Sequence, residues 1–206
     1  MNVVLGEILP YATAIAISPI PIIATILMLM SARARTLGLG FLGGWVLGIA
    51  VAVTAFILLA GVLPEQNSGG PQPILGVVQL LLAAALLALA IKQWRSRPQA
   101  GEEAKLPQWM SAIDSMRPGP AFGLAFLLAA VNPKNLLMAI AAGASIGRAE
   151  LGGTATLVTT VVFVAIAALS VAIPVAAFLV APRQSRIALD AFRAWLTANN
   201  ATIMAV

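Results

Sequence analysis

The stretch AAVNPKNLLMAIAAG, residues 129–143, interrupts one of the long apolar runs of this sequence. Its centre carries four residues that are costly to place in lipid: Asn132, Pro133, Lys134 and Asn135. Asn is a strong N-cap residue, and Pro is favoured at the first helical position. Pro also drives the residue before it out of the helical region. The motif therefore predicts that a new helix begins in the middle of an apolar run.

The composition indicates an integral membrane protein. Of the 206 residues, 61% are hydrophobic and only 9% are charged, which is too little polar surface for a soluble domain of this size. A membrane-spanning helix needs about 20 apolar residues. Five runs meet this length: 8–30, 38–62, 74–91, 121–146 and 153–180. A sixth run begins near Ala198, and we expect it to be cut short at Val206.

The basic residues predict the orientation. Ten of the twelve Lys and Arg residues fall in the connections after the first and third runs and after the fifth run. The positive-inside rule places these connections in the cytoplasm and the N-terminus outside the cell. Segments 106–116 and 186–196 carry apolar residues at helical spacing beside basic residues and Trp. Each is either an interfacial helix on an anionic leaflet or an ordinary connector packed on the bundle.

An internal repeat sets the expected architecture. When ISPIPIIATILML is placed over VNPKNLLMAIAAG, Ser18 falls on Asn132, Pro19 on Pro133 and, further along, Gly38 on Gly152. A three-span unit is odd, so its two copies have opposite orientations, as in many secondary transporters. We expect an all-α polytopic membrane protein with an inverted 3+3 repeat and interrupted first and fourth helices. The alternative is a chance match between two Pro-containing helices.

These assignments define one transmembrane domain, residues 1–206. The first repeat covers about 5–92, a cytoplasmic loop with an interfacial helix about 93–119, and the second repeat about 120–206.

The two interruptions are the candidate substrate site. Both half-helices would begin near the bilayer midplane, with their positive ends and unpaired N–H groups facing a shared cavity. Lys134 adds a full positive charge, and such a site favours an anion. The candidate binding residues are Ser18, Pro19, Pro21, Asn132, Pro133, Lys134, Asn135 and Gln79. The alternatives are that the prolines only kink their helices, that Lys134 snorkels, and that Gln79 makes an interhelical hydrogen bond.

Several chemistries are excluded. The chain has no Cys and no His, so it lacks thiolate ligands, the commonest metal ligand and the usual general base. None of its seven acidic residues lies deep in a run, which argues against a metal or polyamine substrate. We expect no enzymatic activity, no cofactor, no metal and no nucleic-acid partner.

Small residues recur every four positions in the second run, at Gly40, Gly44 and Gly48. Such a stripe lets two helix backbones approach closely. It would pack the second span against the first or form a homodimer interface.

The motifs SPIPIIATILMLMSARAR and GLGFLGGW near the start, with NPKN in the fourth run, resemble the peptidoglycolipid-addressing (GAP) proteins. These are related to the sulfolipid-addressing proteins, within the lysine-exporter (LysE-type) superfamily. The resemblance implies a six-span inner-membrane protein of actinobacteria that moves cell-envelope glycolipids toward the surface. Ser18, Pro19 and Pro21 match the first motif of the family, and Asn132, Pro133 and Lys134 match the second. Amino-acid exporters of the superfamily more often carry PGPN in the first span, and this chain does not.

The leading functional hypothesis is a transporter of membrane lipids or glycolipids with an anionic or polar head group. One alternative is a small-molecule exporter for amino acids or similar zwitterions. Another is a non-transporting membrane scaffold that recruits a lipid synthase through its basic face at 92–117.

Overall fold

The computed structural model describes residues 2–62 and 116–185, together with residues 187, 189 and 191. This part of the chain forms helices and no strands, as expected for an all-α membrane protein. Several sequence predictions fall outside it: Gln79 with the third run, nearly all of segment 106–116, and the sixth run.

In the first half of the chain, a bent helix pair precedes a long helix. Helix α1 (Asn2–Ala16) is followed by α2 (Pro19–Met30), and the two axes differ by 51°. Helix α3 (Ala34–Val62) then runs back along the pair. The run 8–30, expected to be one interrupted span, is therefore two half-length helices.

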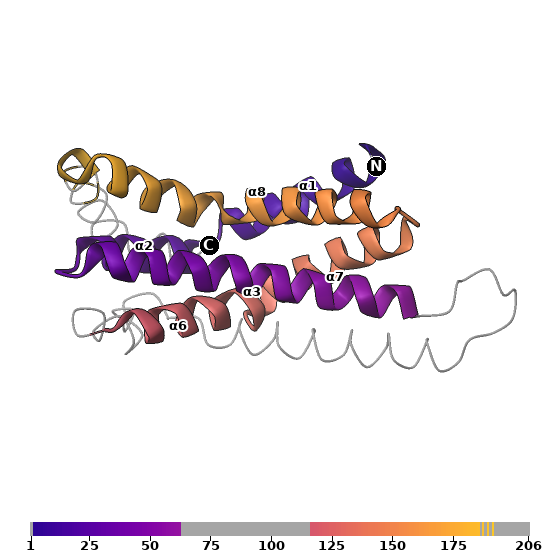
Figure 1. The fold of residues 1–206 in the computed structure, drawn as a ribbon, viewed down its shortest axis with the longest axis horizontal. Helices are drawn as coiled ribbons and strands as arrows, with labels where there is room; N and C mark the ends of the chain where they lie inside the picture. The colour runs from indigo at the N-terminus through magenta and orange to yellow at the C-terminus, as the bar shows by residue number, and fades with distance from the viewer. Residues whose placement is uncertain (1, 63–115, 186, 188, 190, 192–206) are drawn as a thin grey trace, which may run out of the picture.

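The second half repeats this order of elements. Helix α6 (Pro118–Ala130) is followed by α7 (Pro133–Arg148) at an angle of 61°, and then by the long helix α8 (Gly153–Val180). Figure 1 shows that the two bent pairs run in opposite directions along the molecule. By length and composition, α3 and α8 can each cross a membrane, and so can each bent pair if it forms one span.

Glycines place α3 directly against α6 and α7. A Cβ added at Gly40 would lie 2.8 Å from the carbonyl oxygen of Pro118, and one at Gly48 would lie 2.7 Å from the Cβ of Ala129. Gly44 has similarly close contact with the carbonyl oxygen of Phe122. The stripe therefore packs against α6, and the expectation that it packs against the first span was wrong. The reason is that α6 begins at the same end of the bundle as α3 and follows its glycine face.

The same close approach continues along α7. A Cβ added at Gly143 would lie 2.6 Å from the Cβ of Phe56, and one at Gly147 would lie 2.7 Å from the carbonyl oxygen of Ile57. In lipid, helices associate mainly through van der Waals packing, so small residues at the contact stabilise it. The bent pair α6–α7 is therefore held along most of the length of α3.

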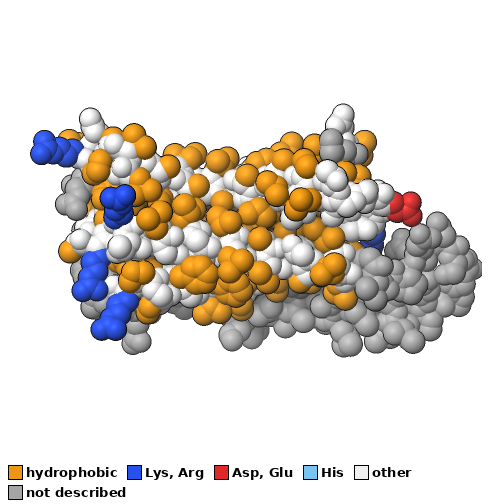
Figure 2. Space-filling model, in the orientation of Figure 1, with side chains coloured by type: hydrophobic (Ala, Val, Ile, Leu, Met, Phe, Trp, Pro, Cys, Tyr) orange, Lys and Arg blue, Asp and Glu red, His pale blue; other side chains and the backbone are white. Residues whose placement is uncertain are grey.

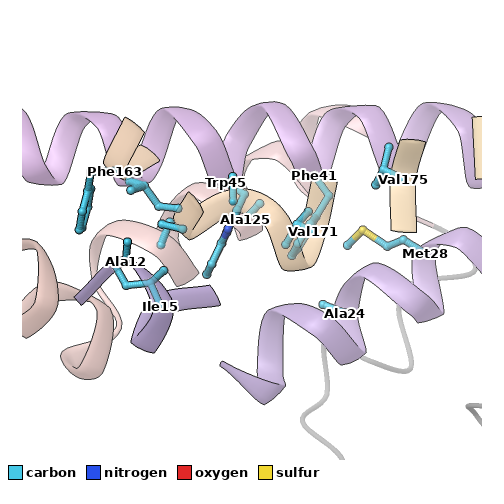
Figure 3. Packing of buried hydrophobic residues seen from close by; sticks show 14 of the residues in the cluster. Ala12, Ile15, Ala24, Met28, Phe41, Trp45, Ala125, Phe163, Val171 and Val175 are labelled. Carbon is cyan, nitrogen blue, oxygen red and sulfur yellow. The ribbon is translucent and has the colours of Figure 1, made fainter. Parts of the chain in front are cut away.

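The main core is built around aromatic side chains of α3. Phe41 and Trp45 stack with their ring centroids 6.5 Å apart, and both are fully buried, as is Phe163 of α8. Figure 3 shows these aromatic side chains beside small and branched residues from α1, α2 and α8. Helix α1 packs against α7 and α8, and α2 packs against α3 and α8. The core thus joins elements of both halves of the chain.

Apolar side chains cover the sides of the molecule and most charged side chains lie at its two ends, as expected for a membrane protein (Figure 2). Exposed apolar side chains cover its sides (Figure 2), including Leu58, Leu157 and Val161. The exposed Arg33, Arg35, Arg117 and Arg183 flank helix ends that lie together at one end of the bundle. Glu7 and Glu150, the acidic residues of the described part, lie toward the opposite end.

Candidate functional site

The break between α6 and α7 is capped from inside the motif. Asn132 has an extended backbone (φ −60°, ψ 125°), and its side-chain oxygen accepts a hydrogen bond of 3.0 Å from the backbone N–H of Lys134. Pro133 occupies the first helical position, where its missing N–H removes no helical bond. The prediction that a new helix begins here is confirmed.

Asn135 ties the two half-helices together. Its side-chain NH₂ donates a 3.0 Å hydrogen bond to the carbonyl oxygen of Leu128, in the last turn of α6. The last carbonyls of a helix have no intrahelical donors. The side chain of Asn135 provides a donor for one of these carbonyls, that of Leu128. The other polar atom of this side chain, the amide oxygen Oδ1, is also buried. It accepts no hydrogen bond from the described residues.

The break between α1 and α2 has the same geometry but weaker capping. Ser18 is extended (φ −71°, ψ 121°), and Pro19 begins α2, as predicted. However, the Ser18 side chain makes no capping hydrogen bond, although the residue is only 3% exposed. Pro21 is buried, and its carbonyl oxygen accepts a 2.7 Å hydrogen bond from the hydroxyl of Thr25. Within the described residues, the free N–H groups at the start of α2 therefore have no side-chain acceptor.

The predicted site residues divide into two groups by exposure. Ser18, Pro21 and Asn135 face the interior, whereas Pro19, Pro133 and Lys134 are exposed, and Asn132 is half-buried. Within the described ranges, no hydrogen bond joins the first motif to the second. Gln79 lies outside the described residues.

Lys134 occupies a position far from both ends of its span. Helix α6 before it has 13 residues and α7, in which it is the second residue, has 16. At a rise of 1.5 Å per residue, the backbone of Lys134 lies roughly 20 Å from either end of the bent pair. Its neighbour Val131 is also exposed, at 61%. A positive charge is therefore presented on the side of the bundle, at the level of the break.

The described residues hold no group of three or more His, Cys, Asp or Glu side chains that could bind a metal ion. Most hydroxyls along the spans are also occupied: Thr13, Thr25, Thr159 and Thr160 each donate to the carbonyl four residues earlier. They therefore have no free proton to offer a ligand.

The sequence prediction missed one interior polar group, the indole N–H of Trp45. Trp45 is fully buried, and its indole N–H has no hydrogen-bond partner in the described part. The hydroxyl of Ser170 in α8, a half-buried residue, has none there either. Trp in membrane proteins gathers at the membrane–water interface. Trp45 is instead the twelfth residue of α3, near mid-span. This unusual position was the signal in the sequence for a buried indole N–H.

Comparison with known proteins gives one family. The model of the family described as "Sap, sulfolipid-1-addressing protein" matches residues 8–206. No curated protein and no solved structure matches the chain. The match covers both broken spans and nearly the whole chain, in agreement with the resemblance of its motifs. The chain therefore belongs to the sulfolipid-1-addressing protein family.

Proposed function

We propose that this protein transports cell-envelope lipids or glycolipids with an anionic or polar head group across the bacterial inner membrane. Its family is named for lipid addressing, and its charge distribution suits a membrane protein with its basic end in the cytoplasm. The N-terminus and the turn between α7 and α8 then lie outside.

The observation that carries this proposal is the exposure of Lys134 at mid-span. A Lys at the bilayer centre costs about 2.5–3.5 kcal/mol on insertion scales. An anionic head group beside it would offset this cost, and the positive end of α7 adds to the attraction. Since exposed apolar residues such as Val131 flank the charge, the acyl chains could remain in the lipid while the head group reaches the break.

The two bent pairs support a transport mechanism. Their opposite directions and the long helix after each pair agree with an inverted 3+3 repeat. For the third helix of each unit, the sequence predicts the apolar runs 74–91 and from Ala198 onward. Transporters built in this way place interrupted helices at the substrate site. Rocking of one unit against the other would then expose the breaks alternately to each side of the membrane.

The decisive experiment replaces Lys134 and follows lipid export. A strain that lacks the gene is complemented with wild type, Lys134→Gln or Lys134→Arg, and surface-extracted lipids are quantified by mass spectrometry. Arg148→Gln is the matched control, because Arg148 is the exposed cation at the far end of the same helix. We expect Lys134→Gln to lower surface lipid at least tenfold at equal protein level, and Lys134→Arg to retain most of it.

Normal surface lipid in Lys134→Gln would overturn the proposal. If deletion of residues 106–116 abolished export in that case, the scaffold hypothesis would replace it. If instead the gene conferred resistance to an amino acid or its dipeptide, the small-molecule exporter would replace it.

A further inference from the structure

Three interior polar atoms stand without partners in the described part of the chain. They are the indole N–H of Trp45, the side-chain oxygen of Asn135 and the hydroxyl of Ser170. Trp45 is 0% exposed and Asn135 is 1% exposed. Leaving a buried polar group unpaired costs about 1–3 kcal/mol, so each such group in a folded protein calls for a water, a ligand or a functional reason.

The atoms of Trp45 and Asn135 lie at similar depth. Asn135 is bonded to Leu128, and the next residue, Ala129, contacts Gly48 of α3. Gly48 is three residues after Trp45, which is about 4.5 Å along the helix axis. The two side chains are therefore within about one helical turn of the same level.

Ser170 lies close to that level as well. A Cβ added at Gly38 would lie 3.6 Å from Val175, and α3 and α8 run in opposite directions. One turn earlier in α8 than Val175, Val171 lies beside Phe41 of α3 (Figure 3). Ser170 is thus about one turn from Trp45 along the bundle.

The three helices that carry these atoms surround a common interior. Helices α1 and α3 each pack against both α7 and α8. Asn135 shares the buried face of α7 with Ala142 and Ile146, which belong to the same core as Trp45. The ring of Trp45 extends from α3 toward Ile15, at the end of α1 (Figure 3).

The chemistry of the three atoms selects a hydroxyl group. Trp45 can only donate and the Asn135 oxygen can only accept, whereas the Ser170 hydroxyl can do both. A bare anion would satisfy Trp45 but would be repelled by the Asn135 oxygen, and an ammonium group would do the reverse. A hydroxyl both donates and accepts, so it can satisfy both groups.

We infer that Trp45, Asn135 and Ser170 form a buried subsite for a hydroxyl of the transported head group, next to the charge-binding position at Lys134. This inference rests on the proposed function and deepens it: Lys134 would attract a negative charge, while the interior atoms would distinguish hydroxylated head groups from others of equal charge. An ordered water offers the same hydrogen bonds, and the test separates the two sources.

The test compares two short-chain lipids of equal charge on the purified, full-length protein in micelles. Dioctanoyl phosphatidylglycerol carries head-group hydroxyls, and dioctanoyl phosphatidylmethanol does not. Affinity is measured by titration, and the ¹⁵N-indole resonance of Trp45 is followed by NMR and assigned through its loss in Trp45→Phe. We expect phosphatidylglycerol to bind about tenfold more tightly, roughly the effect of one net hydrogen bond, and to shift this resonance.

The variants remove one hydrogen-bonding atom at a time. Trp45→Phe keeps an aromatic ring and removes the N–H, and we expect it to abolish the preference for phosphatidylglycerol. Ser170→Ala should reduce the preference. Thr159→Val is the matched control, because the buried Thr159 hydroxyl lies in the same helix but donates to the carbonyl of Ala155, and it should leave the preference unchanged.

Equal affinity of the wild type for the two lipids, or an unchanged preference in both Trp45→Phe and Ser170→Ala, would overturn the inference. An identical response of the Trp45 resonance to both lipids would assign the site to water and overturn it as well. Failure here with export still dependent on Lys134 would leave the proposed function standing. Export independent of Lys134 would count against the proposed function itself.

Discussion

The side-chain amide of Asn135 donates a hydrogen bond to the carbonyl oxygen of Leu128 across the break between α6 and α7. The backbone N–H of Lys134 donates to Asn132 in the same turn. The two Asn residues of the motif thus serve opposite helix ends, one at the start of α7 and one at the end of α6. This arrangement explains how a broken backbone is stabilised in a span where water is scarce.

Replacement of Asn135 by Leu is expected to destabilise the protein by about 1–3 kcal/mol, because the Leu128 carbonyl would lose its donor while it remains inside the span. Unfolding in mixed micelles by titration with SDS measures this loss. A stability equal to that of wild type would show that another group satisfies Leu128.

The two breaks should respond differently to loss of their cap residues. Asn132→Ala removes a cap hydrogen bond and should cost about 1 kcal/mol, whereas Ser18 makes no such bond and Ser18→Ala should cost less. The same unfolding assay compares the two variants directly. Equal losses would contradict the difference in capping.

Adjacent glycines in α3 offer a matched test of helix packing. An added Cβ at Gly44 meets the carbonyl of Phe122, whereas one at Gly43 would lie 3.6 Å from the Phe122 ring, an ordinary contact. Gly44→Ala should therefore destabilise the protein by about 1–3 kcal/mol or more, since α6 must move away. Gly43→Ala should be neutral or stabilising by up to about 1 kcal/mol, because Ala favours the helix. Thermal unfolding of the two variants side by side checks this order.

Glu150 sits in the turn between α7 and α8 with a left-handed backbone (φ 46°), which is unfavourable for a residue with a Cβ. Glu150→Gly should raise stability by about 1 kcal/mol, while Glu150→Ala, which removes the charge but keeps the Cβ, should give no such gain. The midpoint of thermal unfolding for both variants separates the backbone effect from the charge effect.

The absence of Cys from the sequence makes the orientation directly measurable. Single substitutions Ala32→Cys, at the basic end, and Gly152→Cys, at the other end, both fall at exposed positions. On intact cells, a membrane-impermeant maleimide should label Gly152→Cys and leave Ala32→Cys unlabelled until the membrane is opened. The opposite pattern would reverse the orientation proposed from the basic residues.

Much of the architecture could be predicted from local chemistry. The helix starts at Pro19 and Pro133 follow from the missing N–H of proline and from the residue before it, which Pro keeps extended. The long spans follow from apolar runs of membrane length, and the predicted run 153–180 coincides with α8 (Gly153–Val180). These features depend on residues that are neighbours in the chain, so they can be predicted without knowledge of the fold.

Which side of each break faces the interior depends instead on the packing of the helices against one another. Lys134 and Asn135 are adjacent in sequence, yet one is exposed and the other buried, because the helices packed around α7 set its rotation. The same long-range packing placed the glycine stripe of α3 against α6 and left the indole N–H of Trp45 without a hydrogen-bond partner among the described residues. Such contacts join residues about 80 or more positions apart, and no local pattern in the sequence specifies them.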